Sequence, residues 1–201
     1  MFRVAIVGHS QIPHNVGDHI EGAVVDFYRK PGGKVAEWSN TPELNSVLDH
    51  SYNLVFLWLG SNDVKSSIDL GVLTTAILNI AAQIQRCCGA FVWIVEPERR
   101  TTVSRTPGLT ELEYKRIVRG IKRRLGRQNS FPLIWMTQSK FPLGFDGVHA
   151  SVEGKTQLRS RLRAIISNER DKFKHYGPVA YHARYIPSKP YVEKPVSWRL
   201  N

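Results

Sequence analysis

The sequence predicts a single α/β domain, a three-layer α/β/α sandwich built around a parallel, flavodoxin-like sheet. Short apolar runs, typical of strands covered on both faces, alternate with segments whose apolar residues recur at helical spacing. Such alternation is typical of β-α-β units, in which the strands are parallel and helices cover both faces. We expect this domain to cover residues 1–170, and a basic arm rich in proline and tyrosine to follow over residues 171–201.

The strands are predicted from short apolar runs bounded by glycine or polar residues. Four core strands are expected, at residues 2–7, 53–59, 90–95 and 131–136. The second of these, NLVFLWL, is so apolar that it predicts a central parallel strand. Residues 24–27 and 34–37 are weaker strand candidates around a turn at Pro31-Gly32-Gly33.

The helices are predicted from their capping residues and from apolar residues that recur every three or four positions. They are expected at residues 42–50, 68–84, 110–127 and 151–166. Thr41 before Pro42 is typical of a helix start, and Thr110 with Glu113 matches a capping box. From Asp171 onward prolines recur, so this arm is not expected to be helical.

The composition bears on partners and location. A net charge of +11 and a pI near 9.9 favour contact with polyanions such as nucleic acid or anionic lipid surfaces. The strongest charge signal is the basic helix face over residues 115–127, and it is either a solvated face or a nucleic-acid-binding surface. Adjacent Cys87 and Cys88 give no disulfide framework, which fits a reducing compartment. We see no signal peptide and no transmembrane run, so a cytoplasmic location is expected, with a nuclear one as the alternative.

Small polar residues follow three of the predicted strands. They lie in the segments Gly8-His9-Ser10, Gly60-Ser61-Asn62-Asp63 and Asp146-Gly147-Val148-His149. Because the carboxyl ends of parallel strands meet at one edge of a sheet, we expect these segments to lie close together there. Each motif taken alone has a plainer interpretation: a helix cap for the serine, a turn for the asparagine, and a cap or metal-binding pair for the Asp-x-x-His.

Together these residues are the parts that acyl transfer requires. Ser10 is expected to be the nucleophile, His149 the base and Asp146 the acid that orients the imidazole. The Asn62 amide and the backbone N–H groups of Ser10 and Gly33 are expected to stabilise the oxyanion.

Four stretches of the sequence, within residues 2–167, resemble the conserved blocks of the SGNH hydrolase superfamily, the GDSL-like esterases and lipases. They are VAIVGHSQ, PGGK, WLGSND and FDGVHASVEG. The resemblance implies a three-layer α/β sandwich and gives Ser10, Asp146 and His149 the triad positions. It likewise gives Gly33 and Asn62 the oxyanion positions. Members of this superfamily cleave carboxylic esters, acetyl-sugars, lipids or thioesters without a cofactor.

One position departs from the superfamily pattern, because its usual Asp before the nucleophile is His9 here. His9, Arg99 and Arg100 are predicted substrate contacts, the arginines because guanidinium suits carboxylate or phosphate.

We therefore expect a serine ester hydrolase that removes a short acyl group, such as acetyl, from a small ester or acylated substrate. The alternative is an SGNH-like binding module that acts on nucleic acid through its basic surface, with weak or no catalysis. Such domains occur in RNA-binding proteins of some retrotransposons and in some viruses. The C-terminal arm is a candidate contact for a protein partner or a second copy of the chain.

Overall fold

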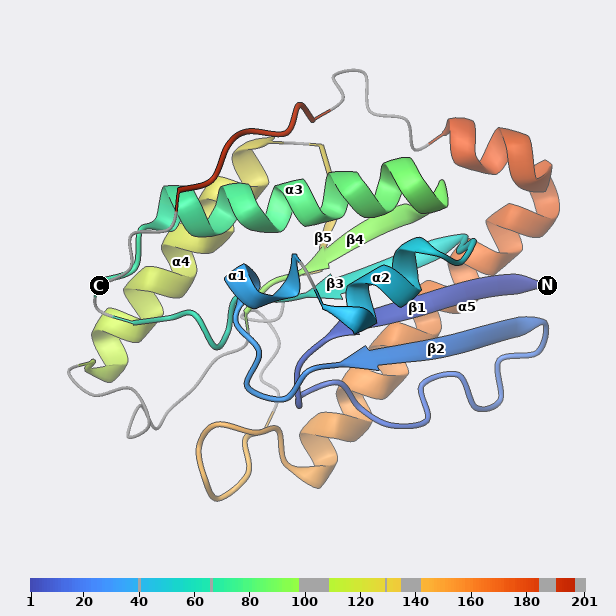
Figure 1. The fold of residues 1–201 in the computed structure, drawn as a ribbon. Coiled ribbons are helices and arrows are strands. Elements are labelled where there is room, and N and C mark those ends of the chain that lie inside the picture. The colour runs from blue at the N-terminus through green and yellow to red at the C-terminus, as the bar shows by residue number, and fades with distance from the viewer. Residues whose placement is uncertain are drawn as a thin grey trace.

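The computed structural model describes residues 1–39, 41–65, 67–97, 109–128, 130–134, 142–184 and 191–197. Its centre is a sheet of parallel strands in the order β2-β1-β3-β4-β5 (Figure 1). The strands are β1 (Phe2–Gly8), β2 (Ala23–Arg29), β3 (Leu54–Trp58), β4 (Phe91–Val95) and β5 (Leu133–Ile134). This order is the flavodoxin-like one, so the predicted fold class is confirmed.

The helices lie on both faces of the sheet (Figure 1). They are α1 (Val35–Trp38), α2 (Pro42–Leu48), α3 (Leu70–Cys88), α4 (Glu111–Gln128) and α5 (Val152–Ala183). The capping residues act as predicted: the Thr41 hydroxyl accepts from the Leu44 N–H at 3.1 Å, and Thr110 forms a capping box with Glu113. Among the described residues, no helix is long and apolar enough to cross a membrane.

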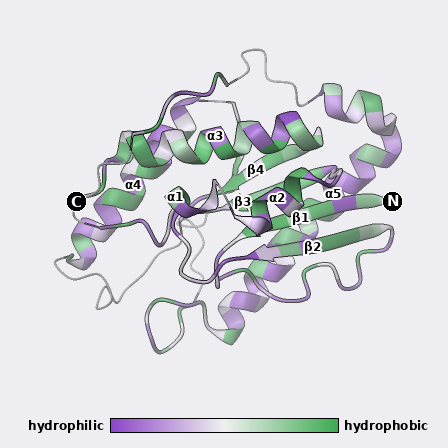
Figure 2. Cartoon of the chain, viewed as in Figure 1, coloured by the Kyte–Doolittle hydropathy of each residue, from purple (hydrophilic) through white to green (hydrophobic). Residues whose placement is uncertain are grey.

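Two apolar clusters, one on each face of the sheet, hold the layers together. In β1, Ala5 and Val7 join the cluster with α1 to α4, whereas Val4 and Ile6 join the cluster with α5. Alternate residues of a strand point to opposite faces, so a strand that is apolar throughout belongs at the centre of three layers. Figure 2 shows hydrophobic strands between helices that carry both polar and apolar residues.

The prediction of a strand at residues 34–37 was wrong, because this segment is the short helix α1. A distant side chain explains the difference. Both carboxylate oxygens of Asp63 accept the Val35 N–H, each at 3.1 Å, and so cap the first turn. The candidate at residues 24–27 was right and lies within β2. Residues 135 and 136 of the last predicted strand lie outside the described part of the chain.

The prediction that the chain leaves helical structure at Asp171 was also wrong, because α5 continues to Ala183 with a kink. Gly177 at φ 73° breaks the regular turn, and Pro178 then stands where a new helical segment begins. Beyond the kink, Tyr181 is fully buried, its ring 5.9 Å from that of Phe2. Aromatic packing against the core therefore extends this helix past the expected boundary.

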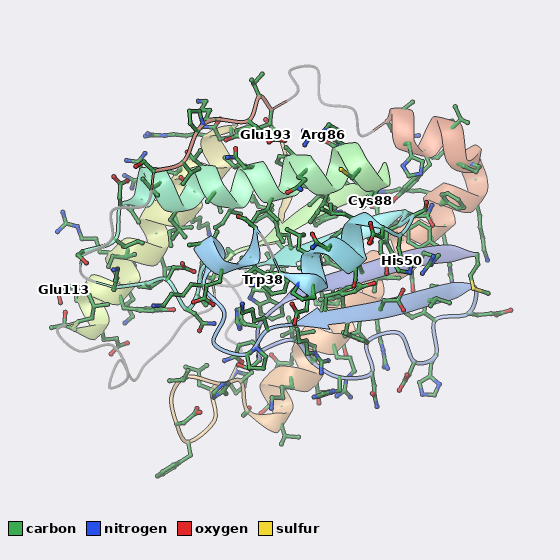
Figure 3. The ribbon with its side chains drawn as sticks, viewed as in Figure 1. Trp38, His50, Arg86, Cys88, Glu113 and Glu193 are labelled. Carbon is green, nitrogen blue, oxygen red and sulfur yellow. The ribbon has the colours of Figure 1, made fainter. Side chains whose placement is uncertain are left out.

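Residues 191–197 lie along α3 (Figure 1). The Asn79 amide donates to the Lys194 carbonyl at 2.7 Å and accepts the Lys194 N–H at 3.1 Å. Arg86 of α3 pairs with Glu193, and Figure 3 labels both side chains. This part of the C-terminal arm is thus bound to its own domain.

Candidate active site

Three predicted catalytic side chains, from two distant segments, meet in one hydrogen-bonded row. The Ser10 hydroxyl lies 3.4 Å from His149 Nε2, and His149 Nδ1 lies 2.5 Å from an Asp146 carboxylate oxygen. Ser10 is the second residue after β1 and is exposed. The first distance is long for a hydrogen bond, as is common in enzymes without bound substrate. The row runs from a hydroxyl through an imidazole to a carboxylate.

The segment that carries His149 is a closed loop ahead of α5. Leu143 and Ala150 form an antiparallel bridge at its ends, and the Gly144 N–H donates to the His149 carbonyl at 2.7 Å. Gly147 adopts φ 63°, a left-handed conformation that glycine takes without steric cost. This turn folds the loop back, so that Asp146 faces the imidazole three residues later.

Asp146 both shapes the loop and holds the His149 ring. One carboxylate oxygen binds the imidazole, and the other accepts the backbone N–H groups of Val148 and His149 at 3.0 and 2.9 Å. The hydrogen bond from His149, followed by these backbone N–H groups, holds the pKa of Asp146 below its usual range. Asp146 is therefore ionised at neutral pH and can stabilise an imidazolium next to it.

The predicted oxyanion residues also lie side by side. The Asn62 amide donates to the Gly33 carbonyl at 3.2 Å, which joins the segment after β3 to the segment after β2. The Gly33 N–H donates to the Lys30 carbonyl at 3.0 Å. To bind an oxyanion, this N–H has to turn from Lys30 or share its hydrogen between two acceptors.

Asp63, the residue after Asn62, is buried and only 6% exposed. Burial raises the pKa of the Asp63 carboxyl to about 6, although the Val35 N–H and the charge of Lys34 act in the opposite direction. Its bonds to Val35 fix the start of α1 against the segment that carries Asn62.

Of the predicted substrate contacts, only His9 lies in the described part of the chain. Its ring is 2% exposed and packs edge-on against Trp58, with centroids 5.7 Å apart. His9 Nδ1 also accepts the Gln11 N–H at 3.4 Å, across the turn that carries Ser10. Arg99 and Arg100 lie outside the described residues. Within the described ranges, no cluster of three or more His, Cys, Asp or Glu could hold a metal ion.

Sequence reasoning missed two residues of this site, Gln11 and Asp63. Gln11 is 2% exposed, and its carboxamide binds the backbone on both sides of His149. Asp63 stands next to Asn62 in the sequence, but its bonds to the start of α1 were not predicted. Each of the two residues follows a predicted site residue in the sequence. That position alone does not show where the side chain points.

The fold has close counterparts among solved structures. A protein from Slackia heliotrinireducens, described as a candidate SGNH hydrolase, matches with a TM-score of 0.64 at 15% identity. The match covers 82% of this chain and 96% of that one. The chain has the SGNH hydrolase fold.

Two further matches have named activities. An acetyl xylan esterase gives a TM-score of 0.62 at 15% identity, over 82% of this chain and 99% of that one. An inhibitor-bound aryl esterase from M. smegmatis gives 0.62 at 14% identity, over 85% and 99%. No protein-family profile and no curated protein sequence matches the chain. In this SGNH hydrolase fold, the Ser10 and His149 segments both lie beyond the carboxyl edge of the sheet, where such sheets bind ligands.

Proposed function

We propose that the protein is a serine ester hydrolase with Ser10, His149 and Asp146 as its triad. The observation that carries this proposal is the row of contacts from the Ser10 hydroxyl through both imidazole nitrogens of His149 to the Asp146 carboxylate. These groups come from segments 139 residues apart in sequence. An exposed serine in line with an imidazole held by a carboxylate is the arrangement that activates a hydroxyl nucleophile.

The mechanism follows from the atoms that face one another. His149 Nε2 takes the Ser10 proton as the hydroxyl oxygen attacks the ester carbonyl, and it then gives that proton to the departing alcohol. The same nitrogen then takes a proton from water as the water oxygen attacks the acyl-serine. As the acid leaves, His149 Nε2 gives this proton to the Ser10 oxygen. Throughout, Asp146 holds the Nδ1–H of His149 and stabilises the imidazolium. The Ser10 and Gly33 N–H groups and the Asn62 amide donate to the oxyanion. The Asn62 amide has two N–H donors, so one can bind the oxyanion while the other keeps its bond to the Gly33 carbonyl.

We propose a short acyl group, with acetyl as the first choice. The proposal is supported by the acetyl xylan esterase among the proteins of the same fold. A series of p-nitrophenyl esters from acetate to octanoate tests it. We expect kcat/KM to fall as the acyl chain lengthens, and a maximum at octanoate would contradict a short-chain preference.

The triad is tested with p-nitrophenyl acetate on the wild-type protein and on Ser10→Ala and His149→Ala. We expect each change to lower kcat on the order of a thousandfold or more. The exposed residues Ser160 and His175 on α5 provide matched controls, because Ser160→Ala and His175→Ala remove the same groups far from the site. Turnover that survives in both triad variants would refute the proposal.

A second candidate function is nucleic-acid binding through α4, and one observation favours it. Four arginines lie on the side of α4 opposite its buried residues, all exposed; we call them the arginine stripe. They are Arg116, Arg119, Arg123 and Arg127. At 100° per residue they fall within an arc of about 80°, and they span about 16 Å along the helix axis. A row of guanidinium groups with this reach suits successive phosphates of a nucleic acid.

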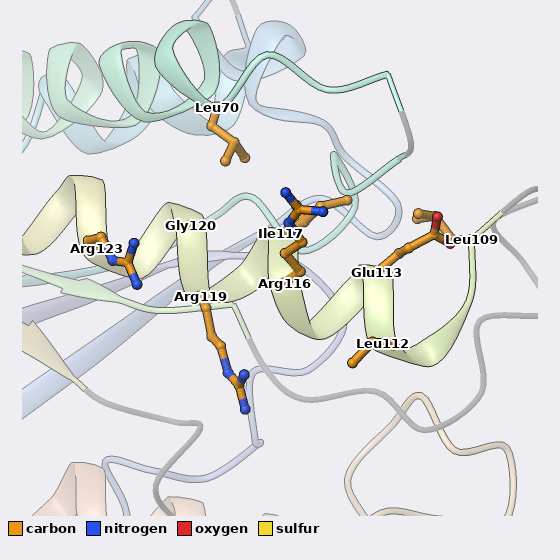
Figure 4. Close-up of a pocket in the computed structure, with 9 residues that line it drawn as sticks. All are labelled: Leu70, Leu109, Leu112, Glu113, Arg116, Ile117, Arg119, Gly120 and Arg123. Carbon is orange, nitrogen blue, oxygen red and sulfur yellow. The ribbon is translucent and has the colours of Figure 1, made fainter.

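A pocket of about 740 Å³ lies beside this stripe, between α3 and α4 (Figure 4). Its lining includes Leu70, Ile117 and three arginines of the stripe. The arginine side chains do not all point the same way, and Arg119 points away from Leu70 (Figure 4). No triad residue lines this pocket, so the two candidate functions can be tested separately.

The test is the anisotropy of a labelled single-stranded RNA, measured at several salt concentrations. Four phosphate contacts predict that log K falls with log [salt] at a slope of about −3. Arg119→Gln with Arg123→Gln should weaken binding and flatten the slope by about 1.4. The matched control is Lys155→Gln with Lys174→Gln, which removes the same charge from exposed positions of α5. Equal effects of both pairs would show nonspecific attraction and refute a site on α4.

A further inference from the structure

Gln11 joins the segment of the nucleophile to the loop of the base. Its Nε2 donates to the Val148 carbonyl at 2.9 Å, and its Oε1 accepts the Ala150 N–H at 3.1 Å. The carbonyl of one residue and the N–H of the second residue after it face the same edge of an extended segment. The carboxamide therefore pairs with the His149 segment as the backbone of a neighbouring parallel strand would.

Two other bonds of this loop are local. The His149 N–H binds Asp146, and the His149 carbonyl accepts the Gly144 N–H. These bonds fix the shape of the loop but do not fix its distance from Ser10. The two bonds of Gln11 do, because Gln11 is the next residue after the nucleophile.

We propose that Gln11 is a positioning residue that sets the Ser10–His149 geometry for proton transfer. The proposal rests on the hydrolase function proposed above. Because Gln11 is 2% exposed, water does not readily replace its two bonds. Losing them leaves the buried Val148 carbonyl and the half-buried Ala150 N–H without these partners. A base loop that moves by about 1 Å can lower the rate of the chemical step about a hundredfold.

The first test is Gln11→Leu, which keeps most of the side-chain volume and removes both hydrogen bonds. We expect kcat for p-nitrophenyl acetate to fall about 10- to 100-fold while KM changes less than about twofold. Gln157→Leu is the matched control, because Gln157 is an exposed glutamine on α5. Urea unfolding of each variant shows whether a fall in kcat merely reflects a smaller folded fraction. An unchanged kcat in folded Gln11→Leu would overturn the proposal.

A second variant, Gln11→Glu, provides a readout that a purely structural role would not change. Its ionised carboxylate can accept the Ala150 N–H but meets the Val148 carbonyl, which is another acceptor. Its protonated form can donate to that carbonyl and restore both bonds. We expect the ratio of its kcat to that of the wild type to rise as the pH is lowered. A ratio that does not change with pH, in a folded variant, would count against positioning.

The His149 ring signals in NMR spectra separate this proposal from the triad itself. If wild-type turnover equals that of Ser10→Ala, the hydrolase proposal fails. The positioning of His149 still stands in that case if Gln11→Leu, and not Gln157→Leu, shifts or broadens its ring signals. If wild-type turnover is genuine but neither the ring signals nor kcat respond to Gln11→Leu, positioning alone is refuted.

Discussion

Asp63→Asn should stabilise the protein at neutral pH, because Asp63 is a buried carboxylate whose charge is unfavourable in the folded state. Its pKa rises from 3.8 to about 6 on folding, chiefly through burial. One pKa unit corresponds to about 1.4 kcal/mol, so at pH 7 this ionisation costs the folded state about 3 kcal/mol. Asparagine keeps an oxygen for the Val35 N–H and carries no charge.

The sign of the pH dependence follows from proton binding. Between about pH 4 and pH 6 the folded state binds more protons at Asp63 than the unfolded state does. The contribution of Asp63 to the free energy of unfolding therefore falls as the pH rises through this window and is constant above it. The difference between Asp63→Asn and wild type should grow by about 2 kcal/mol in favour of the variant between pH 4 and pH 7.

Urea unfolding of both proteins at several pH values measures this difference, since other titrating groups contribute equally to each. Asp18→Asn is the matched control, because Asp18 is exposed. A variant that is less stable than wild type at pH 7, or a difference that does not depend on pH, would refute the reasoning. The first result would mean that the bonds of Asp63 to α1 outweigh the cost of burying its charge.

Three further predictions concern the elements around the triad. Gly154→Ala should destabilise the protein by about 1–3 kcal/mol in urea, because an added Cβ would lie 2.3 Å from the Pro142 carbonyl oxygen. An unchanged midpoint would mean that α5 starts farther from this loop. Asp146→Asn should lower kcat by about 10³- to 10⁴-fold, since an amide no longer holds the His149 tautomer or its charge; a small effect in steady-state kinetics would remove Asp146 from the triad. Arg163→Met should lower the free energy of unfolding by about 1–2 kcal/mol, because this guanidinium donates to two carbonyls of the segment after Ser10. Hydrogen exchange that is no faster in that segment would contradict this.

The sequence predicted the sheet well because its strands are apolar on both faces. A run such as NLVFLWL has no polar face to offer solvent, so its place at the centre of the sheet depends little on tertiary detail. Caps such as Thr41 and Thr110 were equally local, since each accepts the N–H of the third residue after it. The errors arose where a distant group decides. Asp63 caps the helix at residues 35–38 from a distant segment, and Tyr181 attaches residues 171–183 to the core.

The candidate site likewise contains residues that could be predicted from local motifs and residues that could not. The four residues for which we propose chemical roles could be picked out from the sequence, because Ser10, Asn62, Asp146 and His149 follow the predicted strands in short motifs. The residues that hold them in place could not. Gln11 bridges 139 residues of sequence to reach Ala150, and an isolated glutamine carries no signal of that contact. The expectation that His9 meets the substrate stays a prediction, since here its ring is buried against Trp58.

The net charge of +11 does not measure how much positive charge is available to a polyanion. On α5, Arg159, Arg163 and Arg170 donate to backbone carbonyls of residues 14–21, at 2.5–3.1 Å. These guanidinium groups hold the segment between Ser10 and β2 against the helix, so part of the positive charge supports the site of the nucleophile. The arginine stripe of α4 makes no such bonds within the described residues and faces away from the core. If the excess charge serves a polyanion, α4 rather than α5 is therefore the surface on which it should bind.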